Sequence, residues 1–416
     1  MNNNRRHFMK QLITASATGI ALPLLASSKE PVTNFELGAG EAYWEKLKGQ
    51  FSIAPNKIMM NAANLCPSPN VIRDKVMEYH TALNSNVSFQ YRALFASIRK
   101  KSITQLAQFV GADESEVGIT RNTSEANCTI VHGLDFKQGD EIIIWEQNHP
   151  SNREIWMSQA KRFGFTVIKV AVPANPKTKN DLVEPFEKAI TSKTKLISFS
   201  HISNLSGIAM PAKEICMMAN AKGIMTMVDG AQSLGMTNIN LHELGCTFYT
   251  ASTHKWLMGS FENGLLYIQK DSFNKVWPNI VGGGWKDSKT VDENLCVLGQ
   301  RNETSPAAIP EALGFYETIG RKKIEERVIE LSTFLKTQIQ SKIPQAQFVT
   351  PLSPELSGGI VIINLPNNEF HEVYDKLYSN YGIATAPSGG IRLSPHIYNT
   401  LKDVDVVVDA LKEISK

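Results

Sequence analysis

The sequence predicts an α/β protein in which one large domain, built on a mostly parallel sheet, shares a cleft with a smaller C-terminal domain. Apolar strand-like runs alternate with helical stretches between residues 116 and 255, a pattern typical of parallel strands covered by helices on both faces. The chain has 416 residues, which is too long for one small domain. Hydrophobic residues make up 42% of it and charged residues 20%, as in a globular protein with a sizeable core.

The expected elements of the large domain follow one another along the chain. A short helix is expected at residues 43–47, within an N-terminal arm. Residues 98–110 carry apolar side chains at spacings of three and four, which predicts an amphipathic helix. Short apolar runs predict strands at residues 116–120, 141–145, 166–170, 195–200 and 224–228. Helices are expected between some of them, at residues 127–134 and 211–222.

The last part of the chain indicates a smaller α/β domain that starts near Ala307. We expect its helices at residues 307–319 and 324–343, and its strands at residues 358–364 and 390–394.

The first 28 residues resemble a twin-arginine export signal. Arg5 and Arg6 are followed in register by Phe8 and Lys10. The apolar stretch after them has roughly 14 residues, fewer than the about 20 that span a bilayer, so we expect no stable membrane insertion. Two small residues near position 28 suit a signal peptidase cut. We therefore expect the twin-arginine (Tat) export machinery to carry the folded protein to the periplasm, although a chance Arg-Arg pair is the alternative.

Charge and cysteine usage exclude some functions. The formal net charge is +3 and the sequence has no long basic runs, which argues against nucleic acid as the main partner. The five cysteines show no CxxC pair and no clustered spacing, so neither a disulfide framework nor a metal site is indicated.

Two residues near the middle of the chain indicate the chemistry. Asp229 ends the apolar run at residues 224–228, and Lys255 follows 26 residues later among apolar and hydroxyl residues. This gap leaves room for one crossover and a second strand, so both side chains should meet at one edge of the sheet. Pyridoxal 5'-phosphate needs a lysine that forms a Schiff base and a carboxylate that keeps the ring nitrogen protonated. We therefore expect Lys255 and Asp229 to be catalytic, with pyridoxal phosphate as the cofactor.

Two further segments have polar residues directly after predicted strands. Thr123 and Ser124 follow the strand at residues 116–120 and precede a predicted helix. Free N–H groups at a helix N-terminus and two hydroxyls can hold a phosphate, although an ordinary helix cap has the same local pattern. His149 follows the strand at residues 141–145, where ligands bind in open α/β sheets.

The motifs VDGAQSLG at residues 228–235 and ASTHKW at residues 251–256 resemble the class V aminotransferases. These are fold type I pyridoxal phosphate enzymes, and the branch includes cysteine desulfurases and isopenicillin N epimerase. The resemblance runs from about Asn61 to the C-terminus. It implies a homodimer and a large domain with a seven-stranded, mostly parallel sheet. The domain limits that it implies are an arm at residues 29–57 packing on the small domain, a large domain at residues 58–306 and a small domain at residues 307–416.

The resemblance also assigns cofactor contacts. His149 would stack on the pyridine face and assist catalysis, while Asn204 and Gln232 would bond the phenolic oxygen. The phosphate would be held by Thr123, Ser124, Ser252 and His254.

Three more roles follow from the same resemblance. Thr304 would touch the cofactor phosphate of the partner subunit. Arg392 would bind the α-carboxylate of an amino-acid substrate, which a guanidinium matches with two parallel hydrogen bonds. Asn61 would enter the active site on the substrate side.

One absence narrows the expected reaction. Cysteine desulfurases of this family need a nucleophilic cysteine in the loop before the carboxylate-binding arginine, and residues 381–390 contain none. A persulfide-forming desulfurase is therefore disfavoured, with Cys66 as the remaining candidate nucleophile. We expect transamination or isopenicillin N epimerase-like racemisation of an amino acid or a peptide-derived metabolite. A C–S β-lyase and a non-catalytic pyridoxal phosphate-binding or assembly protein are the alternatives.

Overall fold

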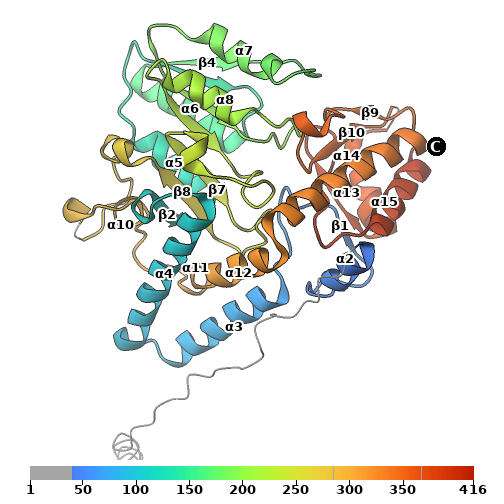
Figure 1. Ribbon diagram of the computed structural model, residues 1–416, viewed down its shortest axis with the longest axis horizontal. Helices are drawn as coiled ribbons and strands as arrows, with labels where there is room; N and C mark the ends of the chain where they lie inside the picture. Colours follow the sequence, from blue (N-terminus) through green and yellow to red (C-terminus); the bar gives the residue numbers. More distant parts are fainter. Residues whose placement is uncertain (1–39, 284, 367) are drawn as a thin grey trace, which may run out of the picture. The chain divides into compact units, whose positions relative to one another are not determined.

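The computed structural model describes residues 40–416, except residues 284 and 367. The predicted export signal and most of the predicted arm lie outside the described residues. The described residues belong to one compact unit, Ala39–Lys416 (Figure 1). Within this described part, no helix is both long enough and apolar enough to cross a membrane.

A seven-stranded sheet forms the centre of the large domain, with the strand order β2-β8-β7-β6-β5-β3-β4 (Figure 1). The strands from β7 to β4 pair in parallel, whereas β8 is antiparallel to both of its neighbours. This confirms the predicted mostly parallel, seven-stranded sheet. The strands are β2 (Val117–Thr120), β3 (Glu141–Trp145), β4 (Thr166–Val170), β5 (Thr194–Ser200), β6 (Met225–Asp229), β7 (Phe248–Ser252) and β8 (Gly264–Ile268).

The helices of the large domain bury their apolar faces against this sheet or one another. They are α3 (Asn70–Ser85), α4 (Phe89–Val110), α5 (Thr123–Gly133), α6 (Pro150–Phe163), α7 (Asn180–Ala189), α8 (Ala212–Asn220), α9 (Leu241–Leu244), α10 (Val291–Leu295) and α11 (Thr304–Ala307), with short 3-10 turns η1 (Glu114–Glu116), η2 (Lys270–Lys275) and η3 (Trp285–Asp287).

Helix α5 begins earlier than the sequence predicted. It starts at Thr123 and not at residue 127, because the side chain of Asn122 accepts a hydrogen bond from Glu125 N and caps the helix. Thr123 and Ser124 therefore lie in the first helical turn instead of in a preceding loop.

The C-terminal part of the chain forms a four-stranded antiparallel sheet, β12-β13-β10-β9, with a core of its own. Its elements are β9 (Gln347–Phe348), β10 (Val361–Asn364), β11 (Ile383–Ala384), β12 (Ala386–Pro387), β13 (Ile391–Leu393), α12 (Ile309–Ile319), α13 (Arg321–Lys342), α14 (Phe370–Tyr381), α15 (Leu401–Ile414) and η4 (Pro354–Leu356). Strand β1 (Ile58–Met59) pairs in parallel with β11, so a segment that we assigned to the large domain is part of the structure of the small one.

Helix α2 (Glu41–Lys48), which lies next to α15 in Figure 1, is fastened to the small domain by ion pairs. Lys48 Nζ bonds Asp403 at 2.8 Å, and the buried Arg327 guanidinium bonds Glu41 at 2.9 Å. Glu41 also accepts a hydrogen bond from Leu401 N at 2.7 Å, at the start of α15. The described end of the N-terminal arm thus packs on α13 and α15.

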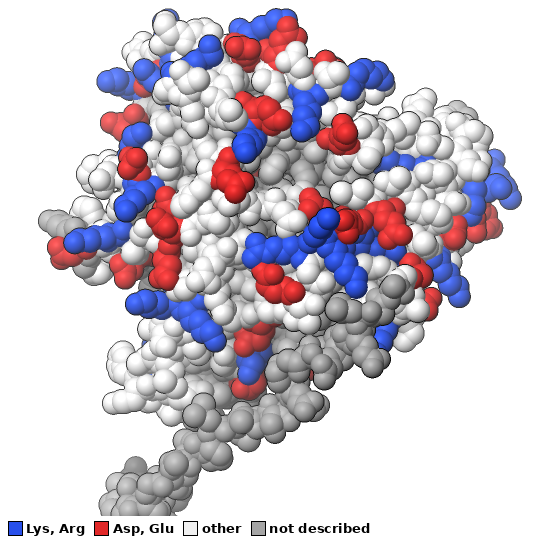
Figure 2. Space-filling view, in the orientation of Figure 1, with Lys and Arg blue, Asp and Glu red and all other residues white. Residues whose placement is uncertain are grey.

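Charges of both signs are interspersed on the face shown in Figure 2. Some charged side chains of the described residues pair with a residue four positions away, such as Lys188 with Glu184 and Arg121 with Glu125. Such exposed pairs contribute little to stability, because solvent screens them.

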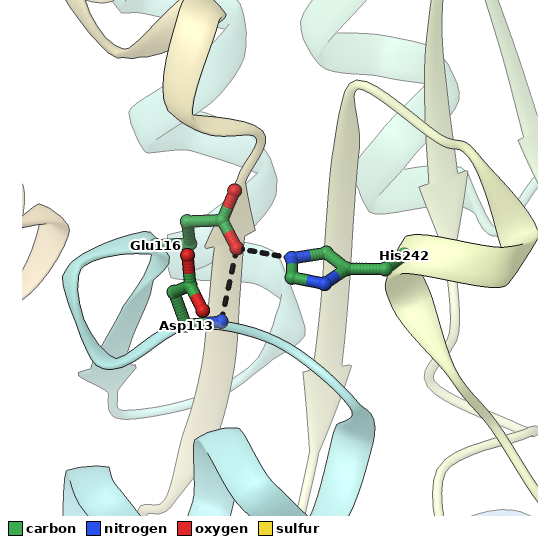
Figure 3. Close-up of side chains that lie close together, drawn as sticks. All are labelled: Asp113, Glu116 and His242. Carbon is green, nitrogen blue, oxygen red and sulfur yellow. Dashed lines mark hydrogen bonds and ion pairs between the residues drawn. The ribbon is translucent and has the colours of Figure 1, made fainter.

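One cluster of titratable side chains lies away from the sheet edge that carries Asp229. Asp113, Glu116 and His242 each offer one atom within 4.8 Å of the others (Figure 3). Both oxygens of the buried Glu116 are already bonded, to Asp113 N at 3.0 Å, His242 Nε2 at 2.6 Å and Lys270 N at 2.8 Å. Glu116 therefore ties η1 to α9 and η2.

Replacing Glu116 with alanine should lower the free energy of unfolding by about 1–3 kcal/mol, because two partly buried backbone N–H donors, Asp113 N and Lys270 N, lose their acceptor. Urea unfolding measures the loss. Glu114→Ala provides the control, since Glu114 is an exposed residue of the same turn. Equal stability of the two variants would contradict this role for Glu116.

Candidate functional site

Asp229 and Lys255 line the same cavity, which has a volume of about 230 Å³. Asp229 ends β6, and β6 pairs in parallel with β7, with Asp229 opposite Thr250. Lys255 follows the end of β7 by three residues. The two side chains therefore meet at the carboxyl edge of neighbouring strands, where ligands bind in α/β sheets.

The environment of Lys255 favours a neutral amine. Burial lowers the pKa of Lys255 to about 8, the Asp229 charge opposes this shift, and the Arg392 guanidinium adds to it. An uncharged lysine amine is the form that attacks an aldehyde or takes up a proton. The amine of Lys255 is thus prepared for both tasks near neutral pH.

The opposite end of the cavity is lined with hydroxyl and imidazole groups. Thr123 N, in the first turn of α5, donates to Ser252 Oγ at 2.9 Å, and the two hydroxyls lie 2.6 Å apart. Ser124 Oγ donates to Ser151 Oγ at 3.1 Å. His254 Nδ1 is buried without a partner, and burial followed by the Lys255 charge lowers the pKa of His254 to about 4. This end can accept an anion, because it combines hydroxyls, a helix N-terminus and an unbonded ring nitrogen.

His149 lines the cavity from the N-terminus of α6. Its Nδ1 lies 2.8 Å from Ser151 Oγ and accepts from Ser151 N at 3.2 Å. Burial lowers the pKa of His149, with Asp229 raising it and with Lys255 and Arg392 lowering it further. The ring is therefore neutral and fixed in orientation, which suits stacking on an aromatic ring.

Asn127 belongs to the site, although we did not select it from the sequence. Its Nδ2 donates to Asp229 Oδ2 at 3.0 Å, while Thr250 Oγ1 donates to its Oδ1 at 2.6 Å. Ala231 N donates to the other oxygen of Asp229 at 3.1 Å. Asn127 could have been selected from the sequence because it is a polar residue one helical turn after Thr123, on the face of α5 that turns towards the sheet.

The position after Asp229 accepts only glycine. A Cβ atom at Gly230 would collide with the ring of Tyr249, whose hydroxyl bonds Ser233 at 2.8 Å. The close approach of β7 to this turn therefore sets the direction in which Asp229 faces the cavity.

Replacing Asn127 with alanine should weaken cofactor binding, because Asp229 then loses a buried donor. The expected cost is about 1–2 kcal/mol, which corresponds to a roughly 5- to 30-fold rise in the dissociation constant. Titration of the cofactor-free protein by visible absorption measures it. Thr129→Ala is the control, since Thr129 Oγ1 donates only to Glu125 O on the same helix. Unchanged affinity in the Asn127 variant would exclude this role.

Arg392 and Asn61 supply unbonded polar atoms on one face of the small domain. Arg392 lies on β13 and is 5% exposed, and its Nη1 donates to Asn204 O at 3.4 Å. Its Nε has no partner, nor does Asn61 Oδ1. The bridge between Asn61 and Ser394 places Asn61 on the same face as Arg392.

The charge of Arg392 is the distinctive feature of this face. In the described part of the chain no Asp or Glu forms an ion pair with it, and burial lowers the pKa of Arg392 to about 10. A buried guanidinium without an acidic partner is costly, so Arg392 is prepared to bind an anion that enters the cleft.

Two other predicted residues, Gln232 and Thr304, have partners within the chain. Gln232 Nε2 donates to Ala63 O at 2.9 Å, and Gln232 Oε1 accepts from Trp256 Nε1 at 2.8 Å, so this side chain braces the lysine segment. One N–H of Gln232 remains for the predicted bond to the cofactor. Thr304 Oγ1 donates to Asn302 at 2.8 Å, and its contact across a dimer stays a prediction.

A family model described as "Aminotransferase class-V" matches residues 60–407. The chain belongs to the class V aminotransferase family. Family membership makes pyridoxal phosphate the cofactor of this enzyme, as the pair Asp229 and Lys255 predicted. The site residues assigned by resemblance all lie within the matched range.

Relatives of this class V enzyme with curated names have different activities. Isopenicillin N epimerase from Amycolatopsis lactamdurans is 28% identical over 395 residues, which cover 90% of this chain and 99% of the relative. A probable cysteine desulfurase from Methanothermobacter thermautotrophicus is 26% identical over 402 residues, which cover 89% of this chain and 98% of the relative.

Solved structures share the fold. The apo structure of cysteine desulfurase from Thermococcus onnurineus NA1 has a TM-score of 0.79 and 22% identity, and the match covers 89% of this chain and 97% of that one. A C-DES mutant with glycine covalently linked to its pyridoxal phosphate has a TM-score of 0.80 and 22% identity. The match covers 88% of this chain and 99% of that one.

The residues of the cavity fit pyridoxal phosphate. The unbonded His254 Nδ1 and the N-terminus of α5 suit the phosphate, and the carboxylate of Asp229 suits a protonated ring nitrogen. Lys255 supplies the amine for the aldehyde. The bound cofactor withdraws electrons from the carbon next to the substrate amino group.

Cys66 lies beside this site but is unsuited to act as a nucleophile. Its N–H donates to His254 O at 3.0 Å, yet its thiol is fully buried, 3.7 Å from Tyr398 Oη. Burial raises the pKa of Cys66 to about 12, whereas thiolate is the reactive form. Cys66 therefore does not replace the cysteine that is absent from residues 381–390.

Proposed function

We propose that this class V enzyme transfers a proton at the α-carbon of an amino acid or an amino-acid-containing metabolite, with transamination or isopenicillin N epimerase-like racemisation as the outcome. The observation that carries the proposal is the pairing of two unusual basic side chains. Lys255 has a pKa of about 8 inside the cavity, and Arg392 is buried without an acidic partner. Lys255 would act at the α-carbon of an amino acid, and Arg392 would bind its α-carboxylate.

Three residues of this chain have defined roles in the proposed reaction. Arg392 binds the α-carboxylate and so orients the α-carbon. Lys255, which becomes free when the substrate amine takes its place, accepts the α-proton as a neutral amine. The Asp229 carboxylate would face the ring nitrogen and is held in place by Asn127 Nδ2 and Ala231 N.

The outcome of the reaction depends on where the proton returns. Return to the opposite face of the α-carbon inverts the amino acid, whereas delivery to another carbon leads to a keto acid. A panel of amino acids and peptide-derived amines, followed by chiral analysis and keto-acid detection, distinguishes the two. If the panel gave neither an inverted amino acid nor a keto acid, the proposal would be overturned.

A C–S β-lyase is the second candidate, because it requires the same proton abstraction but no cysteine nucleophile. The absence of a reactive cysteine at residues 381–390 and the buried thiol of Cys66 favour it over a persulfide-forming desulfurase. Release of sulfide from cysteine, or of cysteine persulfide from cystine, in the same panel identifies it. A non-catalytic cofactor-binding protein would leave every substrate unchanged.

We further infer export to the periplasm. The support is the register of Arg5, Arg6, Phe8 and Lys10. Cell fractionation of the native chain and of a variant with both arginines changed to lysine tests it. Retention of the native chain in the cytoplasm would exclude export.

We also infer a homodimer, in which Thr304 reaches the partner's cofactor. Exposed apolar side chains at Phe261, Trp277, Ile280 and Val281, each 48% to 62% exposed, support a covered surface. Light scattering on the cofactor-loaded protein tests it, and a monomeric mass would exclude the contact of Thr304.

A further inference from the structure

A second, larger hollow of about 540 Å³ lies between the two domains, apart from the cavity that holds Lys255. Its walls are residues 174–177, which precede α7, and residues 348–353, which comprise the last residue of β9 and the segment after it. Both segments lie on the same side of the molecule in Figure 1. Gln147 and Ser206 form part of its lining.

The hollow adjoins the proposed active site through a single turn at residues 203–208. Ser206, on this turn, lines the hollow, while the carbonyl of Asn204, two residues earlier, accepts from Arg392 Nη1 at 3.4 Å. Gln147 likewise lies two residues before His149. The turn at residues 203–208 therefore borders both the hollow and the surroundings of Arg392.

The polar groups of the hollow are arranged to donate. Gln147 Oε1 accepts from Ser206 Oγ at 2.5 Å and from Ser203 Oγ at 3.3 Å. Two hydroxyl donors on the oxygen fix the orientation of the amide, so the Nε2 donors are the free ones. Lys177 adds an ammonium group, and no Asp or Glu is among the lining residues.

Lys177 is exposed, and within the described residues its ammonium group forms no ion pair, although it interacts electrostatically with Asp181. Asp181, the neighbouring acid, uses its carboxylate for Lys177 N at 2.7 Å and Thr178 N at 3.1 Å. The remaining wall is apolar, with Phe348, Leu352 and Leu356. Free donors at one end of an apolar wall match a hydrocarbon chain that ends in a carboxylate.

We propose that this hollow binds the distal end of the substrate, and that this end carries a second carboxylate bound by Gln147 and Lys177. The inference rests on the proposed function, because the α-carboxylate must lie at Arg392. It narrows the substrate class to amino acids or amino-acid-containing metabolites with a distal acid.

The test compares matched substrates, an amino acid with a distal carboxylate and the same amino acid with that group as a neutral amide. The native enzyme should show a kcat/KM at least about tenfold higher for the acid, as expected for charge-assisted hydrogen bonds. Gln147→Glu and Lys177→Gln should each raise KM for the acid about 3- to 10-fold and so reduce the preference for the acid over the amide. Lys179→Gln, a neighbouring lysine that pairs with Glu214 outside the hollow, should behave as the native enzyme.

Calorimetric titration of the cofactor-loaded protein with glutarate separates this inference from the proposed function. Binding that Gln147→Glu weakens supports the hollow as an acid site even if no amino acid in the panel reacts. Turnover of amino acids with equal kcat/KM for acid and amide, and no effect of either variant, would overturn the inference and leave the proposed function intact.

Discussion

Replacing Lys255 with alanine should abolish turnover of every substrate, lowering kcat/KM by at least about 10⁴-fold. The amine is the only group that both anchors the cofactor aldehyde and moves the α-proton in the proposed reaction. Steady-state assays measure the loss, and visible absorption of the purified protein shows whether the covalent link to the cofactor has gone.

Lys336→Met is a matched control for this variant. Lys336 is also a buried lysine, and burial lowers its pKa to about 8, but it donates to Pro351 O at 2.8 Å and Ser357 Oγ at 2.6 Å in the small domain. Its loss should reduce stability and leave kcat per folded molecule unchanged. Turnover by the Lys255→Ala variant would contradict the proposed mechanism.

The lowered pKa of Lys255 also predicts a pH dependence. Only the neutral amine attacks the aldehyde, and the neutral fraction rises as pH increases through about 8. Uptake of pyridoxal phosphate by the cofactor-free protein should therefore accelerate between pH 7 and pH 9 (roughly one unit on each side of the pKa).

Replacing Arg392 with methionine should change activity and stability in opposite directions. Loss of the carboxylate partner should cost about 2–5 kcal/mol of binding, a roughly 30- to 4,000-fold fall in kcat/KM. The cofactor-free protein, however, should become more stable, because an unpaired charge is no longer buried. Kinetics on an amino-acid substrate and urea unfolding measure the two effects.

Arg327→Met gives the contrast. Arg327 is as deeply buried, but it pairs with Glu41 and Glu330 at 2.9 Å and 2.8 Å. Its replacement strands two carboxylates and should lower stability, with no change in KM. If Arg392→Met also lost stability, Arg392 would be a structural residue and its assignment to the substrate would fail.

Several features of this protein were predictable because they depend on neighbours in the sequence. The apolar runs that became β3, β5 and β6 showed strand length and burial, and the carboxyl ends of parallel strands meet at one edge. Asp229, His149 and Lys255 were therefore found together in one cavity, as expected. Strand β8 was not expected, because nothing local indicates that residues 264–268 run antiparallel within the sheet.

The sequence by itself indicated the cofactor pair and the mostly parallel sheet, because strand periodicity and motif spacing are properties of short segments. Only the tertiary structure decided that Asn127 holds Asp229, that the Cys66 thiol is buried beside Tyr398 and that Arg392 has no acidic partner among the described residues. These facts depend on contacts between residues more than 100 positions apart, where burial and the absence of a partner set the charge and reactivity of each group.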